Sequence, residues 1–136
     1  MPTPATDVFL ASMKRCLAAP GFLDSFYDRF IGSSDEVREK FRGVDMKRQV
    51  RMLEDSLYVV AVAVQGEVGS LARNDLPRIA ERHSSRDLGI RPELYDLWAQ
   101  RLIETACAHD PLWADDVAAA WRDTLAFGVE YMRQRY

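Results

Sequence analysis

Residues 26–53 read FYDRFIGSSDEVREKFRGVDMKRQVRML, and this stretch decides the class of fold. Aromatic and aliphatic residues return every three or four positions on both sides of a Gly-Ser-Ser break, the period of helices that bury one face. Ser34 is a typical N-cap for a short helix ending near residues 41–43, and Asp45 can cap a long helix reaching about Val64. The stretch therefore predicts helices joined by tight turns.

The same periodicity continues outward in both directions, and no segment alternates polar and apolar residues as a strand does. Pro20-Gly21 ends the first predicted helix, and Pro92 begins the first of two long helices near the C-terminus. The outer helices are expected at residues 5–18, 22–31, 92–109 and 113–136, with a less regular segment at 67–85 that contains a helix start at 74–77. The chain is thus predicted to be all-α, with six to eight helices in one domain covering residues 1–136.

Composition and charge exclude several classes of protein. The net charge of −3 leaves no basic excess to neutralise phosphates, so nucleic acid is not an expected partner. No apolar run is long enough for a bilayer and the N-terminus has no secretory pattern, so we expect a cytoplasmic protein without membrane insertion. Cys16 and Cys107 form no CxxC or CxxCH pattern, which argues against a zinc site and against covalently attached haem.

The chain contains two histidines, and they differ in context. His109 precedes Asp-Pro at a predicted helix corner and is interpreted as exposed. His83 follows Ile79 by four residues, so a helix presents the imidazole and the alkyl group on one face. That arrangement suits a flat apolar ring whose metal the imidazole binds. A histidine near a helix end is also commonly a cap or a solvated residue.

Three blocks of sequence carry a resemblance to a known family. FYDRF at 26–30 with DEVREKF at 35–41 resembles the pattern FYxRhF…PEhxxxF, where h is an apolar residue and x is any residue. QVRML at 49–53 resembles a QxxxL pattern on a helix that lines the ligand side of a cofactor site. IAERHSS at 79–85 with IRPELY at 90–95 is similar to IAxxHxS…IxPEQY, with a two-residue insertion between the halves. Their order and spacing resemble the globin family, in particular the bacterial globins whose domain also forms the front half of flavohaemoglobins.

The resemblance implies a three-over-three globin fold that holds haem b, with His83 as the axial ligand of the iron. The residues implied to contact the cofactor are Phe41, Leu53, Ile79, His83, Tyr95 and Trp98. Tyr27 and Gln49 are implied to be hydrogen-bond donors at the distal gas site, roofed by Leu53. Without the resemblance, Tyr27 reads as an interfacial aromatic residue and Gln49 as a solvated one.

Two features bear on how far the resemblance extends. In relatives, a glutamate on the last helix joins a polar network with the tyrosine that matches Tyr95, behind the iron-binding histidine. Here Glu130 is the nearby carboxylate, and it is out of register with that glutamate. The donation of electron density to the iron that supports peroxidase-like chemistry is therefore not implied for this chain. Lys47, Arg48 and Arg51 are interpreted as a solvated face, with pairing of one arginine to a haem propionate as the alternative.

The sequence leaves three functions open. The first is reversible binding of O2 and other diatomic gases such as NO and CO. The second is nitric-oxide dioxygenase activity, which would need a separate reductase because the sequence contains no flavin or nicotinamide domain. The third is a globin-fold gas sensor or interaction module. A homodimer is also left open.

Overall fold

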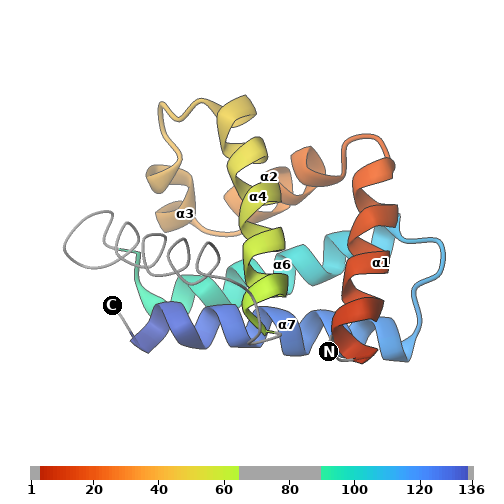
Figure 1. Ribbon diagram of the computed structural model, residues 1–136. Coiled ribbons are helices and arrows are strands. Elements are labelled where there is room, and N and C mark those ends of the chain that lie inside the picture. Colours follow the sequence, from red (N-terminus) through yellow and green to blue (C-terminus); the bar gives the residue numbers. More distant parts are fainter. Residues whose placement is uncertain (1–3, 65–89, 135–136) are drawn as a thin grey trace.

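The computed structural model describes residues 4–64 and 90–134, and these ranges are helical apart from short turns (Figure 1). The helices are α1 (Pro4–Ala18), α2 (Phe22–Gly32), α3 (Asp35–Lys40), α4 (Met46–Val64), α6 (Pro92–His109) and α7 (Asp115–Gln134). The described ranges contain no strand, so the all-α prediction is confirmed there. None of their helices is both long and apolar enough to cross a bilayer. The segment predicted at 67–85 lies outside the described residues.

Local chemistry explains where the helices begin and end. Gly21, between α1 and α2, and Gly43, between α3 and α4, adopt φ of 75° and 74°, a left-handed conformation that glycine tolerates best. The Ser34 hydroxyl accepts a hydrogen bond from the Val37 N–H at 3.4 Å. Asp45 accepts from two backbone N–H groups in the first turn of α4, at 3.1 and 3.3 Å. Both predicted N-caps are therefore confirmed.

Two expectations about the C-terminal corner were wrong. The last helix begins at Asp115 rather than at residue 113, because the N–H of Trp113 first closes a turn on the Asp110 carbonyl at 3.2 Å. His109 is half-buried rather than exposed. Its ring packs edge-on against Phe22 with centroids 5.6 Å apart, and its Nδ1 lies 2.8 Å from the Thr105 carbonyl oxygen.

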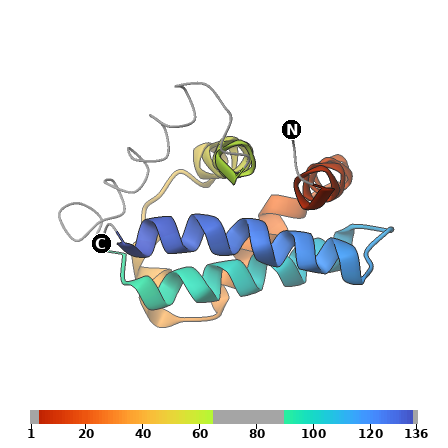
Figure 2. The ribbon, with the colours of Figure 1, turned by 60° about the horizontal axis from the view of Figure 1, so that its bottom comes forward.

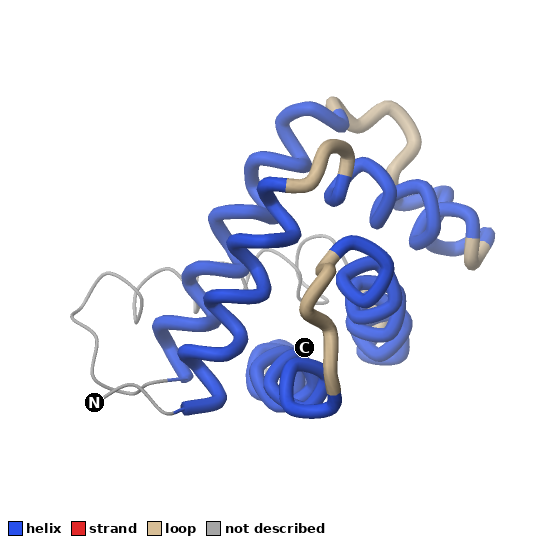
Figure 3. Tube along the Cα trace, turned by 90° about the vertical axis from the view of Figure 1, so that its right-hand side faces the viewer, coloured by secondary structure: helices blue, strands red, loops and turns tan. Residues whose placement is uncertain are grey.

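The long helices pack in crossing layers. α6 and α7 run side by side, and in Figure 2 α1 and α4 appear nearly end-on above them. In Figure 3, short loops join α1 through α4 in succession, and another short loop joins α6 to α7. α4 approaches α7 closely at Gly128, where an added Cβ would lie 3.2 Å from a methyl carbon of Val60. The absence of a side chain at Gly128 therefore sets how near α4 lies to α7.

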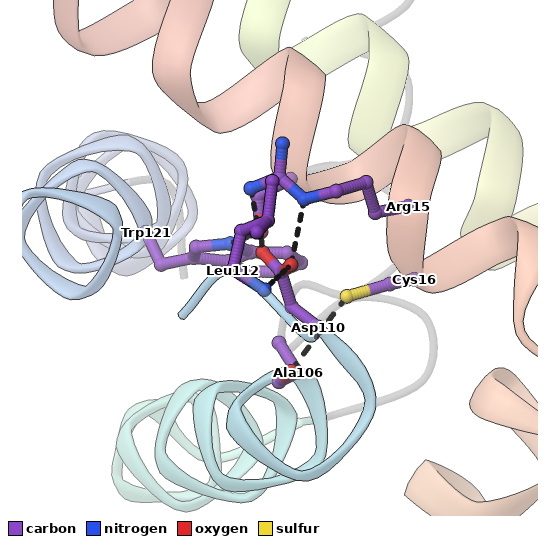
Figure 4. A network of polar contacts seen from close by, with 7 residues as sticks. Arg15, Cys16, Ala106, Asp110, Leu112 and Trp121 are labelled. Carbon is purple, nitrogen blue, oxygen red and sulfur yellow. Dashed lines mark hydrogen bonds and ion pairs between the residues drawn. The ribbon is translucent and has the colours of Figure 1, made fainter. Parts of the chain in front are cut away.

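A buried polar network ties α1 to the corner between α6 and α7 (Figure 4). The Asp110 side chain has no solvent exposure and accepts from the Ser12 hydroxyl at 2.6 Å and from Arg15 at 2.6 and 2.8 Å. It also accepts from the Leu112 N–H at 2.9 Å, and the Trp121 indole N–H donates to the Ser12 hydroxyl at 2.8 Å. The guanidinium of Arg15 lowers the pKa of Asp110 to about 2. The network anchors three helices at the end of the molecule that carries His109.

Candidate functional site

A large cavity lies among α2, α3, α4, α6 and α7. Its volume is about 760 Å³, within the range of sites that hold cofactor-sized ligands. Most of its wall is aromatic or aliphatic. The lining residues are Tyr27, Phe30, Val37, Lys40, Phe41, Val44, Asp45, Arg48, Gln49, Met52, Leu53, Ser56, Val60, Ile90, Leu94, Tyr95, Trp98, Leu125, Gly128, Val129 and Met132.

Residues predicted for one site from distant parts of the sequence line this one cavity. They are Tyr27, Phe41, Gln49, Leu53, Tyr95 and Trp98. Three of them are buried: the exposed fractions of Leu53, Tyr27 and Tyr95 are 6%, 4% and 7%. These side chains therefore face the cavity or the protein core rather than solvent. The two other predicted residues, Ile79 and His83, lie outside the described residues.

Tyr27 carries the polar group best placed for a small ligand. Its hydroxyl donates to the backbone carbonyl of Gln49 at 3.4 Å, which is long for a hydroxyl donor. Burial raises the pKa of Tyr27 to about 12, so the phenol remains protonated at neutral pH and keeps a hydrogen to donate. Because the contact is long, redirecting the hydroxyl toward a ligand costs little.

Aromatic side chains stiffen the wall beneath this hydroxyl. The Tyr27 ring meets Phe41 edge-on at 5.5 Å, and Phe41 meets Phe30 at 6.0 Å. Phe26 stacks on Phe30 at 5.5 Å and contacts Trp98 at 6.4 Å. Ring pairs in these edge-on and stacked geometries stabilise one another beyond the area they bury, so the cavity wall here presents flat aromatic faces.

The polar part of the lining gathers where α3 turns into α4. Lys40, Asp45 and Arg48 line the cavity there and are exposed to solvent, beside the partly exposed Val44 and Met52. An apolar cavity with cations at its opening suits a flat apolar molecule that carries carboxylates. Haem has that shape and charge, and the residues present fit it.

An ion pair links α3 to the residues just before α6, next to the cavity lining. Arg91, just before α6, donates to both carboxylate oxygens of Glu36 on α3, with contacts of 2.5 to 3.0 Å. These hydrogen bonds hold the pKa of Glu36 below its usual range. Val37 and Ile90, the chain neighbours of the two charged residues, line the cavity. The pair therefore holds two parts of the wall together.

If the cavity holds the haem that the resemblance implies, replacing Glu36 with glutamine should increase the rate at which that haem is lost several-fold, because α3 is then freed from the start of α6. The measurement is transfer of hemin to an excess of apomyoglobin, followed by absorbance. Asp35→Asn is the matched control, since the ion pair that the described residues give Asp35 is with Arg38 of the same helix, at 2.6 Å. High salt should bring the wild-type rate toward that of Glu36→Gln. Equal rates for the two variants in low salt would contradict a role for the pair in retention.

Several lining residues were not foreseen from the sequence. Gly128 and Met132 were predicted to lie on the inner stripe of the last helix, but nothing in the pattern separated cavity positions from core positions. Lys40 was not singled out, because a lysine at the end of a short helix usually favours the helix dipole and nothing more. Glu130, considered as a proximal carboxylate, is exposed and accepts from the Gln134 amide at 3.2 Å.

Comparisons with known proteins give one informative similarity. No protein-family model matches the chain, and no curated protein matches it. The fold is similar to that of a Pseudomonas aeruginosa protein whose crystal structure is described as structurally highly homologous to a human hemoglobin. The TM-score is 0.90 and the sequences are 34% identical, over 97% of this chain and 98% of the other. This similarity over nearly the full length of both chains, together with the helical arrangement, shows that the chain belongs to the globin family.

Proposed function

We propose that this protein is a bacterial haem-binding globin that reversibly binds O2 and other diatomic gases in the cytoplasm, related within the family to the globin domain of flavohaemoglobins. The observation that carries the proposal is the cavity itself: a buried, protonated tyrosine and a glutamine face a wall of fixed aromatic rings, with cations at the opening. We take the cofactor to be haem b, because no cysteine pattern supports covalent attachment.

His83 is proposed as the iron ligand. The only other histidine, His109, does not line the cavity, and its ring and Nδ1 are engaged with Phe22 and Thr105. The chain segment that contains His83 runs between two described residues of the cavity wall, Val60 and Ile90. The described residues on either side of His83 in the sequence therefore line the cavity, which supports His83 over His109.

Different side chains of the cavity would have different roles in gas binding. A bound haem supplies an iron atom on which a diatomic gas can be held. Phe41, Leu53 and Trp98 exclude water and restrict the space beside the ring. Tyr27 and Gln49 donate hydrogen bonds to a gas that takes up negative charge, and a buried donor of this kind is worth about 1–3 kcal/mol. Lys40 and Arg48 pair with the cofactor carboxylates.

The direct test is an oxygen titration of the ferrous protein, which should give a reversible oxygenated spectrum with slow release. Rapid conversion of the oxygenated form to ferric protein and nitrate on adding NO would show that the same site can also act as a dioxygenase. A ferrous protein that takes up neither O2 nor CO would contradict the proposed function.

Tyr27→Phe should speed O2 dissociation about tenfold, because it removes one buried donor worth about 1.4 kcal/mol. The phenyl ring keeps the packing against Phe41, so haem content should be unchanged. Stopped-flow displacement of O2 by CO measures the rate. Tyr58→Phe, on the exposed side of α4 and outside the cavity lining, is the control and should leave it unaltered. An unchanged rate in Tyr27→Phe would mean that the hydroxyl points away from the ligand.

A further inference from the structure

Three cations at the start of α4 form an exposed group that we call the cationic face: Lys47, Arg48 and Arg51. All three are exposed to solvent, and among the described ion pairs none joins any of them to a carboxylate. Residues 35–51 contain six basic and four acidic side chains, a net charge of +2 in a chain whose total is −3. Arg38 and Arg42 pair with Asp35 and Glu39, so the positive excess of this stretch centres on the cationic face, while the remaining residues of the chain carry a net charge of −5.

The charges at the start of α4 are opposite in sign to those at the start of the other described helices. α1, α2, α3, α6 and α7 each have an acidic residue in the first turn, where the helix dipole is positive. The first turn of α4 has no acidic residue and contains Lys47 and Arg48 instead, with the capping carboxylate of Asp45 before them; Glu54 and Asp55 come later in the helix. The helix dipole and the side chains add to a single positive field. This arrangement lowers helix stability, and departures from the local rule of this kind are typical of functional surfaces.

The cationic face adjoins the solvent-exposed part of the cavity lining, which is what we mean by the cavity opening. Arg48 lines the cavity, and so do the neighbouring Val44 and Met52, whose exposures are 36% and 49%. Exposed apolar residues surrounded by charges are the usual composition of a site for a protein partner. Lys47 and Arg51 do not line the cavity, so pairing with cofactor carboxylates does not account for them.

We propose that the cationic face is the docking site for an acidic redox protein that reduces the haem. This inference rests on the proposed function, because the cofactor gives the partner something to reduce. The step moves one electron from the reduced partner to the ferric protein, giving ferrous protein and oxidised partner, and no bond forms or breaks. The acidic remainder of the surface repels such a partner, while the cationic face attracts it to the cavity opening.

The test uses the ferric holoprotein and a reduced plant-type [2Fe–2S] ferredoxin, an acidic one-electron donor, in stopped flow at low ionic strength. The variant is Lys47→Glu combined with Arg51→Glu, which leaves the cavity lining intact. The control is Lys14→Glu combined with Arg122→Glu, which changes the net charge equally at exposed positions on α1 and α7. Reduced lumiflavin, an electron donor without ferredoxin's acidic surface, reports whether the haem itself has changed.

We expect the α4 variant to be reduced by ferredoxin at least tenfold more slowly than the wild type, the control less than twofold more slowly, and all three equally by lumiflavin. Rising salt should slow the wild type and narrow the difference. Lys47→Glu places an acid in the first turn of α4, where the helix dipole is favourable, but Arg51→Glu adds a like charge near Glu54 and Asp55. Melting curves of all three proteins are therefore recorded, and the kinetics are compared at a temperature where each is fully folded.

Three results would overturn the docking proposal. One is an equal loss of rate in the α4 variant and the control, and another is a wild-type rate that does not depend on salt. The third is binding to phosphatidylserine vesicles that the α4 variant loses while its ferredoxin rate is unchanged, since the partner would then be a membrane. A protein without a haem spectrum would instead contradict the proposed function, and that failure is seen before any ferredoxin is added.

Discussion

His83→Ala should abolish stable haem incorporation, leaving a protein that purifies with little or no Soret absorbance. An axial imidazole bond is the strongest single interaction proposed between this chain and the cofactor, and the apolar wall alone would hold the ring only loosely. Added imidazole should restore part of the absorbance, because it can occupy the space left by the side chain. The measurement is haem content per protein after co-expression and gel filtration.

His109→Ala is the matched control, since it removes the chain's other histidine. Its ring packs on Phe22 at the end of α6, and the variant should keep a full complement of haem with some loss of stability. Normal haem content and spectrum in His83→Ala would defeat the assignment of the iron ligand. Loss of haem in His109→Ala, with folding intact, would move the assignment to that residue.

Asp110→Asn should lower the free energy of unfolding by about 3 kcal/mol, the largest stability effect that the structure indicates. The carboxylate has no solvent exposure and accepts from Ser12, Arg15 and Leu112. An amide of the same shape accepts fewer of these bonds and leaves the guanidinium of Arg15 without its buried counter-charge. Urea denaturation of the apoprotein measures the change, with Asp123→Ala as a control at an exposed carboxylate. A change below about 1 kcal/mol, the size expected of a surface site, would contradict the importance of this network.

The same residue predicts how stability depends on pH. The pKa of Asp110 is lowered to about 2 in the folded protein, against about 3.9 in an unfolded chain. Its stabilisation, about 2.6 kcal/mol from this difference, is complete above pH 4 to 5 and is lost as the pH falls through 4 toward 2. Asp110→Asn should therefore flatten the stability curve in that window. An unchanged acid dependence would mean that other carboxylates determine it.

The sequence predicted the parts of the fold that depend on local chemistry. Ser34 and Asp45 cap the helices expected of them, because a side-chain oxygen before an apolar repeat acts within three residues. The start of the last helix was misplaced because the turn from Asp110 to Trp113 depends on a carboxylate buried by α1, nearly a hundred residues earlier. A buried aspartate and an exposed one have the same sequence signature, so neither the network nor the packing of His109 was visible in advance.

The candidate site was predicted through resemblance more than through local chemistry. Tyr27, Phe41 and Gln49 were grouped by their spacing within the globin pattern, and the structure brings them to one cavity. Glu36 and Arg91 were not paired in advance, because charged residues 55 positions apart give no local signal. The cationic face was recognised as a cluster, but its position at the cavity opening required the three-dimensional arrangement.

The measurement that tests the central claim most directly is the absorption spectrum of the purified protein, produced with ample haem and recorded in the ferric, dithionite-reduced and CO-bound states. The account predicts a Soret band that shifts on reduction and sharpens and shifts again with CO, as expected for a histidine-ligated iron open to gas. The absence of a Soret band, even after titration with hemin, would contradict it and leave a globin fold that works without haem.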